Sequence, residues 1–169
     1  MPDSDTFSIN PIADFIGRKI PIDSYCVDPF ARNSPFKRFC YTNDLDPDFD
    51  TDCHMDALDF LKSIPDEKAD FVLFDPPYSP RQVSECYKKM GKTVNMETTQ
   101  SSFWGDMKKE ISRITKPKGS VMCFGWNSGG IGEKRGFMLT EILIVAHGGA
   151  HNDTICTLEI KDSLQEKLL

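Results

Sequence analysis

The sequence lacks the long apolar runs that a membrane-spanning protein needs. No apolar stretch among its 169 residues approaches the ~20 residues that span a bilayer. Its first residues, Met1-Pro2-Asp3-Ser4-Asp5, also lack the basic start and apolar centre of a secretory signal. We therefore expect no membrane association and a cytoplasmic protein.

Closely spaced cysteine pairs are missing as well, which argues against a zinc site and against any bound metal. The six cysteines are scattered, at Cys26, Cys40, Cys53, Cys86, Cys123 and Cys156. Several lie in apolar runs, where a free cysteine behaves as a small core residue. His147 and His151 flank a predicted turn, but two histidines without a third ligand do not indicate a metal. We expect reduced, buried thiols.

Basic charge is in short supply, since the formal net charge is −6. A protein that works on nucleic acid usually has a basic face, so this value counts against such a substrate. Local groups of basic residues exist nevertheless: Lys88, Lys89 and Lys92, then Lys108, Lys109, Arg113, Lys116 and Lys118, and finally Lys134 and Arg135. Each group fits either a phosphate-binding patch or a solvated helix face, and both interpretations stay open.

What the chain does contain is an alternation of short apolar runs and helical stretches. This pattern predicts one α/β domain, residues 1–169, around a mostly parallel sheet with helices on both faces. We expect seven strands, over residues 24–27, 39–42, 52–55, 71–74, 120–124, 138–146 and 154–160. Helices are expected over 11–20, with Asn10 as N-cap, and over 57–64 and 103–115, and residues 29–37 are expected to form a turn that opens a helix. Residues 80–100 are expected to be irregular. Gly148-Gly149 and Asn152-Asp153 predict an antiparallel hairpin between the last two strands.

Three acids, Asp28, Asp44 and Asp56, follow successive predicted strands. In a doubly wound sheet, ligands bind beyond the carboxyl ends of the strands. An acid after the second strand is well placed to hydrogen-bond the ribose hydroxyls of a nucleoside cofactor. The next strand ends in Asp75-Pro76-Pro77-Tyr78, so all four features should line the same edge.

That tetrapeptide is rich in hydrogen-bond acceptors. Its two prolines remove amide donors and stiffen the chain, and Asp75 adds a carboxylate. Tyr78 supplies an aromatic face on which a base can stack. A planar ring that bears an NH2 group fits such an arrangement.

Asp75-Pro76-Pro77-Tyr78 resembles the catalytic motif of the S-adenosylmethionine-dependent DNA N6-adenine methyltransferases, and the resemblance covers about residues 7–161. It implies a Rossmann-like methyltransferase fold and catalytic roles for Asp75, Pro76, Pro77 and Tyr78. It implies that S-adenosylmethionine is bound by Asp28, Pro29, Phe30, Ala31, Asp44, Asp56 and Ala57, with Asp44 on the ribose and Asp56 on the adenine.

The same resemblance implies a flipped adenine of DNA as substrate. We expect Tyr78, Ser79, Lys88, Lys89, Trp126 and Asn127 to bind it, with residues 80–100 as a candidate target-recognition insert. So short an insert suggests a homodimer or a separate DNA-recognition subunit. A compact enzyme of this kind suits a bacterial cell or a phage-infected host.

One departure from the family is the absence of glycine from its first cofactor-binding turn, which here reads Asp28-Pro29-Phe30-Ala31-Arg32-Asn33-Ser34. Two alternatives therefore stay open. The first is methylation of another sp2 amino group, in RNA adenine, cytosine N4 or a protein amide. The second is a catalytically inactive subunit that binds nucleic acid or a partner enzyme.

Overall fold

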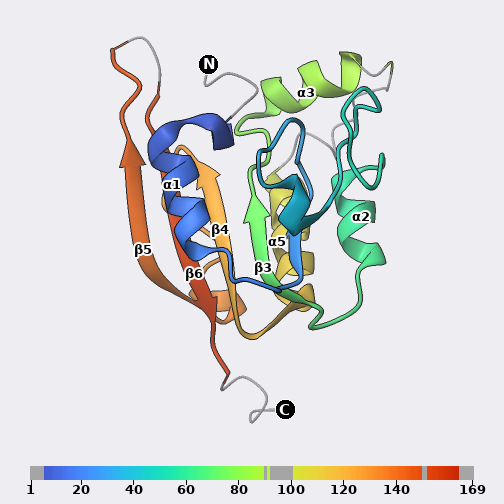
Figure 1. Ribbon diagram of the computed structural model, residues 1–169. Coiled ribbons are helices and arrows are strands. Elements are labelled where there is room, and N and C mark those ends of the chain that lie inside the picture. The colour runs from blue at the N-terminus through green and yellow to red at the C-terminus, as the bar shows by residue number, and fades with distance from the viewer. Residues whose placement is uncertain (1–5, 90, 92–100, 150–151, 164–169) are drawn as a thin grey trace.

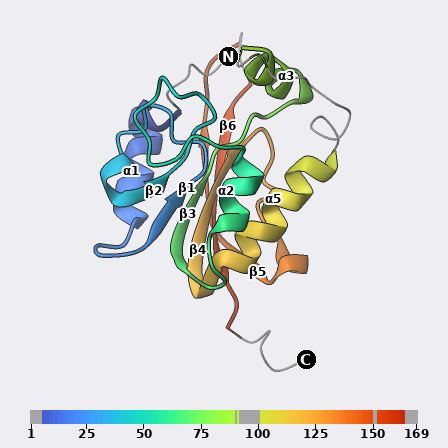
Figure 2. The same cartoon turned by 90° about the vertical axis from the view of Figure 1, so that its right-hand side faces the viewer.

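The computed structural model describes residues 6–89, 91, 101–149 and 152–163. In this part of the chain six strands form one sheet, and helices lie on both of its faces (Figures 1 and 2). The strands are β1 (Cys26–Asp28), β2 (Cys40–Thr42), β3 (Ala69–Phe74), β4 (Thr115–Gly125), β5 (Phe137–Val145) and β6 (Thr154–Lys161). This is a three-layer α/β arrangement.

The sheet is mixed, with the order β2-β1-β3-β4-β6-β5. The four strands from β2 to β4 are parallel, whereas β6 is antiparallel to both β4 and β5. Because β1, β2, β3 and β4 run the same way, their carboxyl ends meet at one edge of the sheet (Figure 1). Side chains that follow these four strands are therefore brought together.

The predicted strand over residues 52–55 is not present in the described structure, so the expectation of seven strands is corrected to six. This segment makes only an isolated bridge between Asn43 and Cys53. The carboxylate of Asp52 instead accepts hydrogen bonds from the backbone amide (2.8 Å) and hydroxyl (2.7 Å) of Thr42. Such side-chain bonds compete with a strand ladder, which explains why a polar segment fails to extend the sheet.

The main helices are α1 (Asn10–Lys19), α2 (Ala57–Ser63), α3 (Pro80–Lys89) and α5 (Ser101–Ile114), and short 3-10 turns cover Thr6–Ser8, Lys37–Phe39 and Glu133–Arg135. Asn10 is the first residue of α1 rather than its cap, and Ile9 precedes it without a side-chain capping bond. Residues 29–36 form turns, so the predicted helix there is reduced to the short one at Lys37–Phe39.

Residues 80–89 were expected to be irregular and instead form α3. Pro80 stands at the first helical position, where a missing amide costs nothing. The hydroxyl of Ser79 accepts from the amide of Gln82 (3.3 Å), and the Gln82 side chain accepts from the amide of Tyr78 (2.6 Å). This pattern is close to a capping box, so the helix start was readable from Ser-Pro-x-Gln. Residues 92–100 of the predicted insert lie outside the described residues.

The core has two halves, one on each face of the sheet. Val72 and Phe74 of β3 point into the cluster formed with α2 and α5, whereas Phe71 and Leu73 point into the cluster under α1. Since β3 is central and covered on both sides, all four of these residues are buried. This accounts for the continuous apolar run that precedes Asp75.

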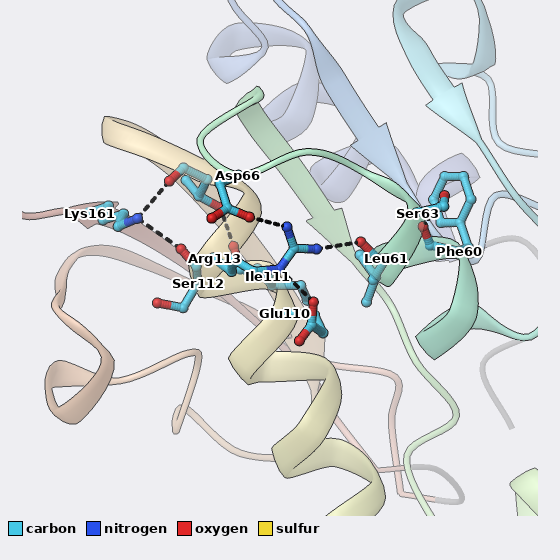
Figure 3. A network of polar contacts seen from close by, with 10 residues as sticks. Phe60, Leu61, Ser63, Asp66, Glu110, Ile111, Ser112, Arg113 and Lys161 are labelled. Carbon is cyan, nitrogen blue, oxygen red and sulfur yellow. Dashed lines mark hydrogen bonds and ion pairs between the residues drawn. The ribbon is translucent and has the colours of Figure 1, made fainter.

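A polar network ties the layers together at the opposite edge of the sheet (Figure 3). The Arg113 guanidinium on α5 bonds to Asp66 (2.5 Å), Glu110 (2.7 Å) and the carbonyl of Leu61 (3.0 Å). Lys161 donates to the carbonyl of Ser112 (2.8 Å). These bonds join α5 to α2, to the segment between α2 and β3, and to the end of β6, so they fix the scaffold away from the carboxyl edge. None of the helices in the described residues is long and apolar enough to cross a membrane.

Candidate active site

Asp28 ends β1, and its side chain is completely buried. One carboxylate oxygen accepts from the amide of Phe30 (3.1 Å), and the other has no hydrogen-bond partner among the described residues. Burial, with a smaller contribution from the negative charges of Asp75 and Asp44, raises the pKa of Asp28 to about 8, against the opposing bond from the Phe30 amide. A buried carboxylate oxygen without a partner is costly, so it indicates a place for a donor or cation.

Asn43 holds the loops of this edge in place, a role that the sequence analysis missed. Its side-chain amide donates to the carbonyls of Pro29 (3.2 Å) and Met55 (3.0 Å), and its side-chain oxygen accepts from the Met55 amide (3.0 Å). Its backbone accepts from Ala31 (2.9 Å) and donates to Asp28 (2.9 Å). Asn43 therefore joins the turn after β1 to the segment that leads into α2. Its place directly before Asp44 was the only available signal.

Asp44 is buried after β2, and its carboxylate accepts from the amide of Asp46 (2.9 Å). Burial raises the pKa of Asp44, while the Asp46 amide and the charge of Arg32 act to lower it. The negative charge of Asp44 also raises the pKa of Asp28, so the two carboxyl groups lie close enough to interact. Two predicted cofactor residues are brought together in this way.

The other predicted cofactor residues lie around these two acids. Asp56 is the N-cap of α2 and accepts from the amide of Leu58 (3.0 Å), and Ala57 is buried beside it. Phe30 is half-buried, and its ring centroid lies 6.1 Å from that of Phe74. Asp56 already has a structural role as a cap, and its predicted contact with the cofactor's adenine stays a prediction.

Asp75-Pro76-Pro77-Tyr78 follows β3 directly, at the same edge. The Tyr78 hydroxyl donates to the carboxylate of Asp75 over 2.5 Å. Burial raises the pKa of Asp75, while hydrogen bonds from Tyr78 and Thr6 act to lower it. Burial, together with the Asp75 charge, also raises the pKa of the Tyr78 phenol. The Asp75 carboxylate is therefore held by two hydroxyl donors, which a substrate donor could replace.

Trp104 on α5 fixes the motif from the other side, and sequence reasoning did not find it. Its indole N–H donates to the carbonyl of Pro77 over 2.9 Å. This bond occupies the carbonyl of Pro77, one of the acceptors that the two prolines leave free. Pro76 itself is buried. The motif is anchored at three points, by Trp104, by Thr6 and by Gln82.

The loop after β4 brings Trp126 to the motif. Its ring centroid lies 5.6 Å from that of Tyr78 at an interplanar angle of 73°, and about two fifths of its surface is exposed. Asn127 is exposed, and its side chain accepts from the amide of Gly129 (2.9 Å). Tyr78 and Trp126 thus form an aromatic pair beside Asp75, and their binding of the target stays a prediction.

Glu159 on β6 secures the far end of that loop and was not singled out by the sequence. Its buried carboxylate accepts from the amides of Ile131 (2.6 Å) and Gly132 (3.0 Å). A side chain at Gly130 would clash with it, since a Cβ there would lie 2.2 Å from a Glu159 oxygen. No short-range pattern could have revealed this contact between β6 and the loop.

Of the predicted substrate residues on α3, Lys88 is exposed, and Ser79 caps the helix. Lys89 closes the helix, but its side chain lies outside the described part of the structure. Within the described residues, no group of three or more His, Cys, Asp and Glu side chains could hold a metal ion.

Comparison with solved structures identifies the fold. A Burkholderia thailandensis 1,6-didemethyltoxoflavin-N1-methyltransferase, with bound 1,6-didemethyltoxoflavin and S-adenosylhomocysteine, has a TM-score of 0.62 at 10% identity, with 90% of this chain and 77% of that chain covered. A Methanosarcina mazei SAM-dependent methyltransferase has a TM-score of 0.54 at 10% identity, covering 88% and 97%. TrmN from Thermus thermophilus has a TM-score of 0.54 at 16% identity, with 89% of this chain and 48% of that chain covered.

The chain therefore has a Rossmann-like α/β methyltransferase fold with a mixed six-stranded sheet. No protein-family model matches its sequence, and no curated protein is similar to it. At identities this low the likeness defines the fold alone, and the activity has to be argued from the site.

Proposed function

We propose that this protein transfers a methyl group from S-adenosylmethionine to the N6 amino group of adenine in DNA. The observation that supports this most strongly is the grouping of Asp28, Asp44 and Asp75 at the carboxyl edge, with one oxygen of Asp28 buried and unpartnered. In folds of this type that edge binds nucleotide cofactors. The proposal takes residues 1–169 as one methyltransferase domain.

The residues fit the cofactor in chemical terms. S-adenosylmethionine has an ammonium group and ribose hydroxyls, and these are donors for buried carboxylates. Asp28 offers an oxygen that needs a donor, and Asp44, after β2, is placed to accept from ribose hydroxyls. Phe30, Ala31 and Ala57 would supply apolar surface around it, and Asp56 an acceptor for the cofactor's adenine.

The cofactor supplies an activated methyl group, so no protein nucleophile is required. What the chain must do is hold the amino nitrogen in line, which is a positioning task. Asp75 is suited to accept hydrogen bonds from an NH2 group, because its present donors are two hydroxyls, Tyr78 and Thr6, that can be exchanged. Such bonds direct the nitrogen lone pair towards the methyl group.

The aromatic pair supports a planar base as the target. Tyr78 and Trp126 lie beside Asp75, and base–aromatic stacking contributes about 1–3 kcal/mol per base. Asn127 and Ser79 add polar groups next to the pair, and Lys88 and Lys89 on α3 would contact phosphates. Target recognition is assigned to residues 80–100, with a homodimer or a separate DNA-recognition subunit as the expected partner.

The test compares the natural protein with Asp75→Ala and Asp59→Ala in transfer of a labelled methyl group to adenine-containing DNA. Asp59 is an exposed acid on α2 and serves as the matched control. Loss of transfer in Asp75→Ala alone supports the proposal, and unchanged transfer would remove it. Parallel reactions with RNA, with cytosine as the only amino base, and with protein decide between the alternative substrates. Absence of cofactor binding, even with DNA present, would favour the inactive-subunit alternative.

A further inference from the structure

Cys26 and Cys40 bring two thiols into contact across the first two strands of the sheet. Their Sγ atoms lie 2.7 Å apart, and both residues are free cysteines. Cys26 begins β1 and Cys40 begins β2, and the parallel ladder sets the two residues directly opposite each other. Both side chains point to the same face of the sheet, where Cys26 belongs to the core under α1 and Cys40 packs against it.

The backbone at this pair already has the geometry that a disulfide requires. Neighbouring strands lie about 4.8 Å apart, and disulfides join Cα atoms that are about 4.4–6.8 Å apart. A covalent sulfur–sulfur bond is about 2.05 Å long, so the thiols of Cys26 and Cys40 have to approach by only about 0.7 Å. Small side-chain rotations supply a movement of this size without shifting β1 or β2.

The two cysteines differ in their access to solvent. Cys26 is buried, with 1% of its surface exposed, whereas Cys40 is half-buried on the edge strand of the sheet. An oxidant in solution therefore meets Cys40 first. Cys26 is the thiol placed to react from inside with whatever Cys40 has become, because the two sulfur atoms are already in contact.

We propose that Cys26 and Cys40 are a redox modification site, at which a low-molecular-weight disulfide oxidises the pair to an internal disulfide that ties β2 to β1. Cys40 loses its thiol proton and attacks the small disulfide, which forms a mixed disulfide and releases one small thiol. Cys26 then loses its proton and attacks the Cys40 sulfur, which releases the second small thiol. In total, two protein thiols are oxidised and one small disulfide is reduced to two thiols.

The bridge would close the segment that carries the candidate cofactor turn. Residues 28–34 lie wholly between the two cysteines, Asp28 ends β1, and Asp44 follows β2. In the described structure β2 is a three-residue edge strand that pairs only with β1, so the bond adds a covalent tie where the ladder is short. Formation of the bond depends on these two strands and not on methyl transfer.

The test treats the purified full chain with glutathione disulfide, stops the reaction with acid, alkylates the remaining thiols in denaturant and identifies linked peptides by mass spectrometry. The hydrogen bond between the two thiols, together with burial, raises the pKa of Cys40, so the reaction is run at about pH 7 and about pH 9 and should be faster at the higher pH. Cys26→Ser and Cys40→Ser each remove one member of the pair. Cys53→Ser is the matched control, because Cys53 is also half-buried but bonds to the Tyr41 hydroxyl (3.1 Å) and packs against the other half of the core.

We expect the natural protein and Cys53→Ser each to lose two alkylatable thiols and to yield peptides linked through Cys26 and Cys40. Their melting temperatures should rise by about 5–10 °C on oxidation, as for a closed loop of about 15 residues, and should return after reduction with dithiothreitol. Cys26→Ser and Cys40→Ser should show no internal bridge and no such rise. Cys26→Ser should instead keep a mixed disulfide between Cys40 and glutathione.

A natural protein that keeps all six thiols after this treatment would overturn the inference, and so would a bridge between other cysteines. A bridge between Cys26 and Cys40 that leaves the melting temperature unchanged would overturn the tie between β1 and β2. If Cys26→Ser does not fold, Cys40→Ser provides the same comparison, because its side chain is only half-buried. Each of these outcomes leaves the proposed methyl transfer to its own test.

Discussion

Replacing Asp28 by Asn should make the free protein more stable and at the same time weaken its cofactor binding. The carboxyl of Asp28 is fully buried, and its pKa is raised from the ordinary 3.8 to about 8. An acid with a raised folded pKa destabilises the fold once the unfolded chain ionises. The cost is absent below about pH 4, grows as the pH rises, and is complete above about pH 8.

The size of this cost follows from the shift. At pH 7 the unfolded carboxyl is about three pH units above its pKa of 3.8, whereas the folded carboxyl is still largely protonated. This difference corresponds to about 4 kcal/mol in favour of a neutral group in the fold. Asn is neutral and of the same shape, and it can still accept from the Phe30 amide. Burial of its NH2 group offsets part of this, so we expect a net gain of about 2 kcal/mol, or about 4–8 °C in melting temperature.

The assay is urea denaturation of the natural protein and Asp28→Asn at pH 4, 6 and 8, with Asp59→Asn as the exposed control. The gain should be smallest at pH 4 and largest at pH 8, while the control stays within about 0.5 kcal/mol throughout. Calorimetry should show at least about tenfold weaker binding of S-adenosylmethionine. A variant that is less stable than the natural protein at pH 8 would refute the reasoning about the buried charge.

Four other substitutions have defined outcomes. Glu159→Ala leaves one buried and one partly buried amide without an acceptor and should lower the unfolding free energy by about 2–4 kcal/mol in urea denaturation. Gly130→Ala puts a Cβ 2.2 Å from Glu159 at a φ of +44° and should cost at least about 3 kcal/mol; a soluble variant of natural stability would contradict this. Asn43→Ala breaks three side-chain bonds and should cost about 2–3 kcal/mol, with weakened cofactor binding measured by calorimetry. Tyr78→Phe removes a bond that lowers the pKa of Asp75, so the acid limb of a pH–rate profile should move to higher pH, and an unmoved limb would count against the assigned role of Asp75.

Much of the scaffold was predictable because its signals are local. The apolar run before Asp75 predicted a strand buried on both faces, and β3 is confirmed as one. The acids Asp28, Asp44 and Asp56 were expected after successive strands. Asp28 ends β1 and Asp44 follows its parallel neighbour β2, whereas no strand precedes Asp56 in the described structure. These expectations depend on periodicity and on strand ends, which a single sequence displays.

The failures have the opposite character, since they depend on contacts made elsewhere. Residues 52–55 resemble a strand, but Asp52 bonds to Thr42 and withdraws the segment from the sheet. The positions of Glu159 and Trp104 cannot be inferred from sequence, because each bonds to a loop many residues away. The start of α3 differs from these cases, because its signal is local. The Ser79 and Gln82 pattern in the sequence predicts a helix start, and both side chains make the corresponding bonds.

The central claim is methyl transfer to the amino group of adenine, and one measurement addresses it directly. The purified full chain is incubated with labelled S-adenosylmethionine and adenine-containing DNA, the DNA is digested to nucleosides, and the labelled nucleoside is identified. We predict label in N6-methyladenine with the natural protein and with Asp59→Ala, and its loss with Asp75→Ala. Label in another nucleoside, or equal label in all three proteins, would contradict the account.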